Sequence, residues 1–257
     1  MTDEKAMTQE NFKPISVKAP SSNKALFHLR CMVDLQLGTI VRYLQPAMAT
    51  LNGKVLDVGA GESPWREWLP PSAIYYGIDI GNAEEFGMHP AREGVTYYDG
   101  RTIPFSDGTF DGAICIEVLE HVEDPDSLVA EIARCLRQDA LLLLTVPWSA
   151  RRHHVPHDYH RFTRERLLRL LEANGFTKIE IVERGSDISA IANKLMVLSL
   201  RLAPRRNHLL QRLWMLPLFL LLIPVTATFL VCAHLAERLG AGAKEDPLGY
   251  FVRAIRR

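Results

Sequence analysis

The sequence has few cysteines and no excess of charge of either sign. Its 257 residues include four cysteines, none of them in the CxxC spacing of a redox or zinc motif. Thirty basic residues balance thirty acidic residues, so no overall field favours nucleic acid as a partner. Residues 1–14 are polar and lack the apolar run of a secretory signal peptide. We therefore expect a cytoplasmic protein with reduced thiols and no nucleic-acid partner.

Charged residues are also missing from one stretch in the second half of the chain. From Leu213 to Ala236 there is no aspartate, glutamate, lysine or arginine, and Pro217 and Pro224 interrupt the run. Helical residues rise about 1.5 Å each, so this stretch is long enough to cross a hydrocarbon core of roughly 30 Å. The arginines just before it are Arg201, Arg205, Arg206 and Arg212. Together they favour contact with anionic lipid headgroups.

Strand and helix patterns alternate from residue 54 onward. The expected strands are 55–58, 74–78, 95–98, 112–116, 140–146, 178–182 and 250–255. The expected helices are 24–50 (broken at Gly38), a short one after Ser63-Pro64, 127–136, 163–173 and 188–202. This alternation predicts an α/β protein with a doubly wound, mostly parallel sheet, which binds ligands at the carboxyl ends of its strands.

A glycine turn after the first strand carries the main functional signal. The strand 55–58 leads into Gly59-x-Gly61, and the next strand ends in Asp79 about twenty residues further on. Glycine lets the backbone approach a ligand, and an acid at this position can accept hydrogen bonds from two ribose hydroxyls. The pair predicts a site for an adenosine-type cofactor, which a nicotinamide dehydrogenase would also have.

Further blocks of sequence separate these possibilities. They are Gly77-Ile78-Asp79, Asp99-Gly100-Arg101-Thr102-Ile103-Pro104-Phe105, Phe110-Asp111 and Glu117-Val118-Leu119-Glu120-His121-Val122. With the glycine turn, they resemble the class I S-adenosylmethionine-dependent methyltransferases, especially the type-11 group, over residues 50–183 and the last strand. The resemblance implies a seven-stranded Rossmann-like sheet with an apolar helical insertion before the last strand. A dehydrogenase has no reason to carry the blocks Ile103-Pro104-Phe105 and Glu117-Val118-Leu119-Glu120-His121.

The resemblance also implies roles for individual residues around the cofactor S-adenosylmethionine. It places Asp57, Gly59 and Gly61 by the methionine part, Asp79 on the ribose, Ile80 on adenine, Asp99 and Gly100 by the adenine amino group, and Glu117 near the methionine end. The third small residue of the family's glycine turn is here Ser63, after Glu62, so we expect the following segment to start differently.

A second dense block follows the fifth strand, where the family builds its acceptor pocket. It resembles the His-x-x-Pro-x-Asp-Tyr-x-Arg-Phe-Thr stretch of bacterial methyltransferases associated with envelope glycans or lipids; the matching residues are His153, Pro156, Asp158, Tyr159, Arg161, Phe162 and Thr163. A hydroxyl acceptor needs a base, and the catalytic candidates are His121, His153 and Asp158. The alternative is a loop that fixes the next helix by pairing aspartate with arginine.

The sequence leaves metal binding open. Glu117, Glu120 and His121 follow one strand, and some related methyltransferases, which act on RNA 3′ ends or quinone precursors, hold a divalent ion with a similar pattern. Such ligands would suit Mg²⁺ or Mn²⁺, but metal-free relatives carry the same letters. Zinc on the four histidines between 153 and 160 is disfavoured, because there is no accompanying cysteine and no HExxH helix.

The expected organisation has three parts. Residues 1–22 form a flexible arm, residues 23–184 and 248–257 form the methyltransferase domain, and residues 185–247 form the apolar insertion. A single membrane crossing would separate the last strand from its sheet. Monotopic attachment to a membrane is therefore favoured over a lid, a homodimer interface or a true span.

The expected function follows from these parts. It is methyl transfer from S-adenosylmethionine, favouring oxygen, to a lipid-linked, glycan or other small-molecule acceptor at the cytoplasmic membrane surface. The alternative is a non-catalytic cofactor-binding protein that docks on the membrane as a partner.

Overall fold

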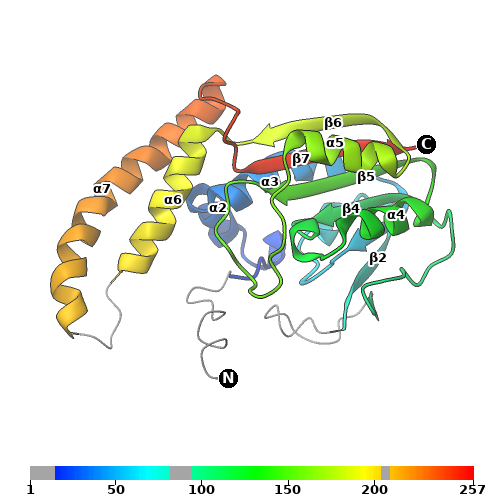
Figure 1. The fold of residues 1–257 in the computed structure, drawn as a ribbon, viewed down its shortest axis with the longest axis horizontal. Helices are drawn as coiled ribbons and strands as arrows, with labels where there is room; N and C mark the ends of the chain where they lie inside the picture. The colour runs from blue at the N-terminus through cyan, green and yellow to red at the C-terminus, as the bar shows by residue number, and fades with distance from the viewer. Residues whose placement is uncertain (1–14, 82–93, 204–208) are drawn as a thin grey trace.

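A seven-stranded sheet forms the centre of the computed structural model, which describes residues 15–81, 94–203 and 209–257, the side chains of 209–214 excepted (Figure 1). The strands are β1 (Gly53–Val58), β2 (Ala73–Ile80), β3 (Val95–Tyr98), β4 (Phe110–Ile116), β5 (Leu136–Pro147), β6 (Phe176–Arg184) and β7 (Gly249–Arg256). Their order is β3-β2-β1-β4-β5-β7-β6, and β7 runs antiparallel to both of its neighbours. The predicted sheet is confirmed, and β1, β2 and β4 end at the same edge.

Helices cover both faces of the sheet. On one face, α4 (Pro125–Cys135) and α5 (Arg164–Ala173) pack buried residues such as Ile132 and Leu170 against strand residues such as Leu142. On the other face, α3 (Leu35–Met48) packs Leu44 and its neighbours against Ile114 and other strand residues. Each strand in the middle is therefore apolar on both sides, as parallel sheets with helices on both faces require.

The leading helix divides at a different residue from the one predicted. Two helices form, α2 (Lys24–Val33) and α3, and the break lies at Asp34, whose side chain accepts a hydrogen bond from the backbone nitrogen of Leu37. Gly38 lies inside α3, where a Cβ atom would stand 2.3 Å from the carbonyl oxygen of Cys31. The glycine allows the two helices to pack closely, and the aspartate cap makes the break.

The segment after Ser63-Pro64 is also shorter than predicted. Only a single 3-10 turn forms there, η2 (Arg66–Trp68). Ser63 has a positive φ of 50°, whereas a helix N-cap has an extended backbone. The serine hydroxyl instead lies within hydrogen-bond distance, 2.9 Å, of the Tyr75 hydroxyl, which ties the turn to β2.

The apolar insertion forms two helices that lie side by side and project from one side of the sheet (Figure 1). They are α6 (Asp187–Leu202) and α7 (Leu209–Leu239), and α7 is one continuous helix that contains both Pro217 and Pro224. Their buried hydroxyls Ser199 Oγ and Thr226 Oγ1 lie 2.9 Å apart. Of the predicted arginine cluster, Arg205, Arg206 and the side chain of Arg212 lie outside the described residues.

The insertion begins and ends at the same edge of the sheet. The backbone nitrogen of Asp187, at the start of α6, donates to the carbonyl oxygen of Ala243 beyond α7. The nitrogen of Leu248 donates to the carbonyl oxygen of Arg184, at the end of β6. Because β7 then pairs between β5 and β6, a single membrane crossing is incompatible with this sheet.

Candidate active site

The glycine turn between β1 and η2 has the conformation that only glycine adopts easily. Gly59 has a φ of 69° and Gly61 a φ of 50°. A Cβ atom at Gly59 would lie 2.5 Å from Cγ2 of Val118, which comes from the segment after β4. The turn therefore brings bare backbone next to the ends of two neighbouring strands.

Asp79, near the end of β2, faces this turn. Its Oδ2 atom accepts a hydrogen bond from the backbone nitrogen of Gly61 at 2.8 Å, and Oδ1 accepts one from Ile80 at 2.8 Å. Burial raises the pKa of Asp79, and the two backbone donors act in the opposite direction. Each carboxylate oxygen has a second lone pair, so the carboxylate can also accept hydrogen bonds from two ribose hydroxyls.

A cavity of about 780 Å³ opens beside the turn, within the size range of small-molecule sites. It joins residues from the ends of β1, β2 and β4 with residues that follow β5. The predicted site residues in its lining are Gly59, Gly61, Asp79, Ile80, Gly100, Glu117, His121 and His153. The donor set and the bare backbone fit an adenosyl cofactor.

The side chains of Asp57 and Asp99 do not belong to this lining. Asp57 is 2% exposed and lies behind the turn, where its Oδ2 atom accepts from the Tyr75 hydroxyl at 2.7 Å. Asp99 is exposed, and its Oδ1 atom accepts from the backbone nitrogen of Arg101 at 2.9 Å. In this structure Asp57 supports the turn, and Asp99 shapes the loop after β3.

Replacing Asp57 with asparagine should change how stability depends on pH. Burial raises the pKa of Asp57 from 3.8 to about 7, so the folded state loses stability as pH rises from about 4 to 7. An asparagine side chain does not titrate. Urea unfolding gives the free energy of unfolding of Asp57→Asn and of the wild type at pH 4 and pH 8. Relative to the wild type, the variant should be more stable at pH 8 than at pH 4 by at least about 1.4 kcal/mol, the value of one pKa unit.

The exposed Asp139 gives the matched control for this prediction. Asp139→Asn should change the free energy of unfolding by the same small amount at both pH values. The same behaviour in Asp57→Asn would show that the buried carboxyl does not titrate as proposed.

Glu117 is held by a buried arginine that the sequence analysis did not identify. Arg184, at the end of β6, is 0% exposed, and its Nη2 atom donates to Oε1 of Glu117 at 2.8 Å. The same guanidinium donates to the carbonyl oxygens of Val146 and Tyr250. Gly249 makes room for it, since a Cβ atom there would lie 2.4 Å from Arg184 Nη2. The only sequence signal for this role is that Arg184 directly precedes a glycine, Gly185, at the end of a strand.

The N-terminal segment also contributes to the site. Residues 1–22 were expected to form a flexible arm, but among the described residues Ile15, Ser16 and Val17 line the cavity. Arg30 of α2 donates to the carbonyl oxygens of Ser16 and Ile15 at 2.7 and 2.6 Å. The last part of the predicted arm is therefore fixed over the cavity.

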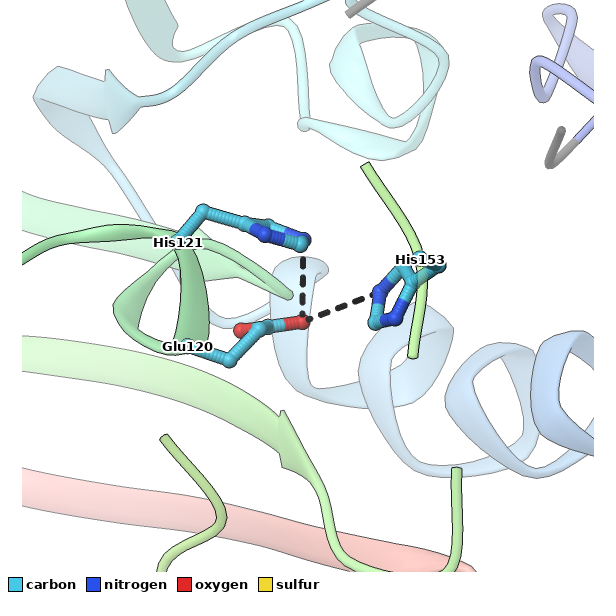
Figure 2. Close-up of side chains that lie close together, drawn as sticks. All are labelled: Glu120, His121 and His153. Carbon is cyan, nitrogen blue, oxygen red and sulfur yellow. Dashed lines mark ion pairs between the residues drawn. The ribbon is translucent and has the colours of Figure 1, made fainter. Parts of the chain in front are cut away.

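Three side chains that the sequence analysis considered meet beside the cavity. Glu120 and His121 lie in the 3-10 turn η4 (Leu119–His121), and His153 lies in the segment after β5 (Figure 2). Oε1 of Glu120 is 3.6 Å from Nε2 of His121 and 3.9 Å from Nε2 of His153. Burial lowers the pKa of both histidines, to about 4 for His153, so both imidazoles are neutral at pH 7.

Asp158 holds the segment after β5 in place. Its two oxygens accept from Arg161 at 2.7 and 3.0 Å, and Oδ2 also accepts from the backbone nitrogen of His153 at 3.0 Å. Its side chain is 2% exposed and does not line the cavity. The geometry fits the structural alternative of aspartate–arginine pairing, with Asp158 positioning His153.

Comparison with known proteins places this site in a family. The family model of a methyltransferase domain matches residues 34–181. The chain belongs to the class I S-adenosylmethionine-dependent methyltransferases. The matched range contains the glycine turn, Asp79, Glu117 and the histidine cluster, and S-adenosylmethionine is the cofactor of this family.

Two curated relatives are similar over part of this methyltransferase. A ubiquinone biosynthesis O-methyltransferase of Pasteurella multocida is 30% identical over 118 residues, 39% of this chain and 49% of the relative. A phosphatidylethanolamine N-methyltransferase of Cereibacter sphaeroides is 30% identical over 96 residues, 34% of this chain and 47% of the relative. The chain thus spans about half the length of these relatives.

Solved structures show the same fold. A methyltransferase dependent on S-adenosylmethionine from Archaeoglobus fulgidus has a TM-score of 0.52 at 16% identity, and the likeness covers 90% of this chain and 99% of that one. A possible histamine N-methyltransferase from Thermotoga maritima has a TM-score of 0.50 at 13% identity, covering 91% and 92%. At these identities the likeness concerns the fold alone.

Proposed function

We propose that this methyltransferase transfers a methyl group from S-adenosylmethionine to an oxygen of a lipid-linked or glycan-type acceptor at a membrane surface. One observation carries the proposal: a single cavity joins the residues suited to the cofactor, around Asp79, with the neutral imidazoles of His121 and His153. Both groups line one hollow, as a transfer between two bound molecules requires.

The chain's own contribution is to position the reactants and to accept a proton. When bound, the cofactor supplies an activated methyl group on a sulfonium sulfur. Asp79 would hold the ribose, and Glu117, fixed by Arg184, would present a negative charge in the cavity to the positively charged cofactor. His121 or His153, being neutral, accepts the proton of the acceptor hydroxyl through a ring nitrogen.

Membrane attachment is supported by the surface of α7. Within this helix, Met215–Leu239 is long and apolar enough to cross a membrane, and little of its most apolar part is buried. Its exposed apolar residues are Leu216, Leu218, Leu220, Leu221, Ile223, Val225, Val231, Leu235 and Leu239. Large apolar surfaces of this kind mark contacts with membranes or partners.

The topology favours insertion from one side over the other options. Both ends of the insertion lie at the sheet, so α6 and α7 can enter a bilayer only as a pair from one side. Among the described residues, none of α6 or α7 lines the cavity, which argues against a lid. The names of the two relatives, ubiquinone biosynthesis and phosphatidylethanolamine, also refer to lipids.

Methyl transfer to membrane extracts tests the proposed function. The purified chain is incubated with S-adenosylmethionine carrying an isotope-labelled methyl group, together with lipid extract, glycan extract or water-soluble metabolites. Mass spectrometry should find a lipid or lipid-linked glycan that gains one labelled methyl. Tight S-adenosylhomocysteine binding with no labelled product in any fraction would support the non-catalytic membrane-docked alternative.

Polar substitutions on α7 should weaken membrane binding. Leu220 and Leu221 are 57% and 65% exposed. Burial of a leucine side chain is worth about 1.5–3 kcal/mol, so Leu220→Gln/Leu221→Gln should lower the liposome-bound fraction more than about tenfold in a flotation assay with anionic lipid. The control is Ile74→Gln/Val182→Gln, which changes two exposed apolar strand residues away from the insertion.

The same variants separate a membrane from a second copy of the chain. If α7 forms a homodimer interface, Leu220→Gln/Leu221→Gln will reduce the molecular mass in solution, and flotation of the wild type will be negligible. That result would remove the membrane surface from the proposed function.

A further inference from the structure

We propose that Glu120, His121 and His153 form a binding site for a divalent transition-metal ion at the edge of the cavity. The three side chains offer one carboxylate oxygen and two imidazole nitrogens within 4.8 Å of one another (Figure 2). This set replaces the sequence-based combination of Glu117, Glu120 and His121, because Glu117 pairs with Arg184.

The buried carboxylate points independently to a bound cation. Glu120 is 0% exposed, and neither of its side-chain oxygens accepts a hydrogen bond within the described part of the chain. A buried carboxylate without such donors is costly unless a cation or a proton compensates for it. Oε1 of this carboxylate is the atom that faces both imidazoles.

Backbone carbonyls set the orientation of the two imidazoles. Nδ1 of His121 lies 2.5 Å from the carbonyl oxygen of His157, and Nδ1 of His153 lies 3.0 Å from that of Arg151. A carbonyl accepts only, so each Nδ1 carries the proton and each neutral ring presents the lone pair of Nε2 toward Glu120. Metal-bound histidines show this arrangement, in which the second ring nitrogen donates to a carbonyl.

The donor set decides which ions fit. Two imidazoles and one carboxylate suit zinc and similar transition metals, whereas Mg²⁺ prefers oxygen ligands. In a tetrahedral zinc site with bonds of about 2.1 Å, ligand atoms lie roughly 3.4 Å apart. The observed separations of 3.6 and 3.9 Å need only small side-chain movements to reach this value.

Three protein ligands leave one coordination position open. His121 and His153 both line the cavity, so an oxygen of the acceptor can reach that position from the cavity side. With both Nε2 atoms bound to the ion, the ion would take over from the imidazole base of the proposed function, by lowering the pKa of the acceptor hydroxyl. This assignment of the fourth ligand rests on the proposed function, whereas binding of the ion itself does not.

Metal titration of the untagged chain of 257 residues tests the site. After removal of metal with a chelator, competition with a chromophoric indicator should show one Zn²⁺ bound per chain, at least tenfold more tightly than Mg²⁺. Co²⁺ should give the visible absorption of a tetrahedral site. Glu120→Gln and His153→Gln should each weaken Zn²⁺ binding about 100-fold or more and remove the Co²⁺ bands.

The control variant is His28→Gln, at an exposed histidine of α2 outside the cavity, which should bind Zn²⁺ like the wild type. S-adenosylhomocysteine binding, measured on every variant, reports whether the fold and the cofactor site are intact. Wild-type protein that binds S-adenosylhomocysteine but not Zn²⁺, or variants that keep wild-type Zn²⁺ affinity, would overturn the metal site and leave the proposed function standing. Zn²⁺ binding without any S-adenosylhomocysteine binding or methyl transfer would overturn the proposed function and leave the metal site standing.

Discussion

Replacing Asp79 with alanine should weaken the binding of S-adenosylhomocysteine by about 100-fold or more. The substitution removes both carboxylate oxygens that can accept from the ribose hydroxyls, and hydrogen bonds to a charged group are worth about 1.5–3 kcal/mol each. A 100-fold change corresponds to about 2.7 kcal/mol. Isothermal titration calorimetry gives the affinity, and circular dichroism shows whether the fold is retained.

Two further variants sharpen this result. Asp79→Asn keeps the shape but removes the charge, and one of its side-chain atoms can no longer accept from Gly61 or Ile80. We expect it to bind more weakly than the wild type and no more weakly than Asp79→Ala. Asp139→Asn, at an exposed position, should leave the affinity unchanged. Wild-type affinity in a folded Asp79→Ala protein would remove the ribose assignment.

Replacing Arg184 with methionine should destabilise the protein by about 3–5 kcal/mol, because breaking a buried ion pair from one side leaves an uncompensated charge. Arg184 is completely buried, and its loss leaves the Glu117 carboxylate without the partner that lies 2.8 Å away. Urea unfolding measured at pH 7 gives the free energy of unfolding.

The chain supplies a matched exposed pair as the control. Arg164 and Glu183 form an ion pair of 3.3 Å in which the arginine side chain is 49% exposed. Arg164→Met should cost less than about 1 kcal/mol, because solvent screens exposed pairs. Adding Glu117→Gln to Arg184→Met should recover part of the lost stability, since the unpaired charge is then gone. Equal effects of the two arginine substitutions would contradict the role assigned to Arg184.

Local sequence patterns were enough to predict the sheet and the glycine turn that faces Asp79. The strands are apolar runs bounded by turns, and Gly59, Gly61 and Asp79 lie directly at strand ends. Parallel strands place such ends side by side whatever the rest of the chain does. The break in the leading helix was placed wrongly, because Gly38 looks like a helix breaker in sequence while its close contact with Cys31 exists only after α2 and α3 pack.

The cofactor-binding roles of Asp57 and Asp99 stay predictions, because neither side chain lines the cavity. Both occupy the expected positions in the chain, at the end of β1 and just after β3. Their side chains nevertheless turn to Tyr75 and to the backbone of Arg101. The orientation of a side chain depends on which partners surround it, and a motif does not record those partners.

The sequence by itself determined the order of the strands and helices, the glycine turn and the long apolar helix, because hydrophobic periodicity and glycine conformation act over a few residues. Only the tertiary structure decided that Arg184 pairs with Glu117, 67 residues away, and that His153 joins Glu120. It also decided that both ends of the insertion return to the same sheet edge. These contacts depend on which strand ends become neighbours. Burial then strengthens the interaction between charged groups, because water no longer screens them.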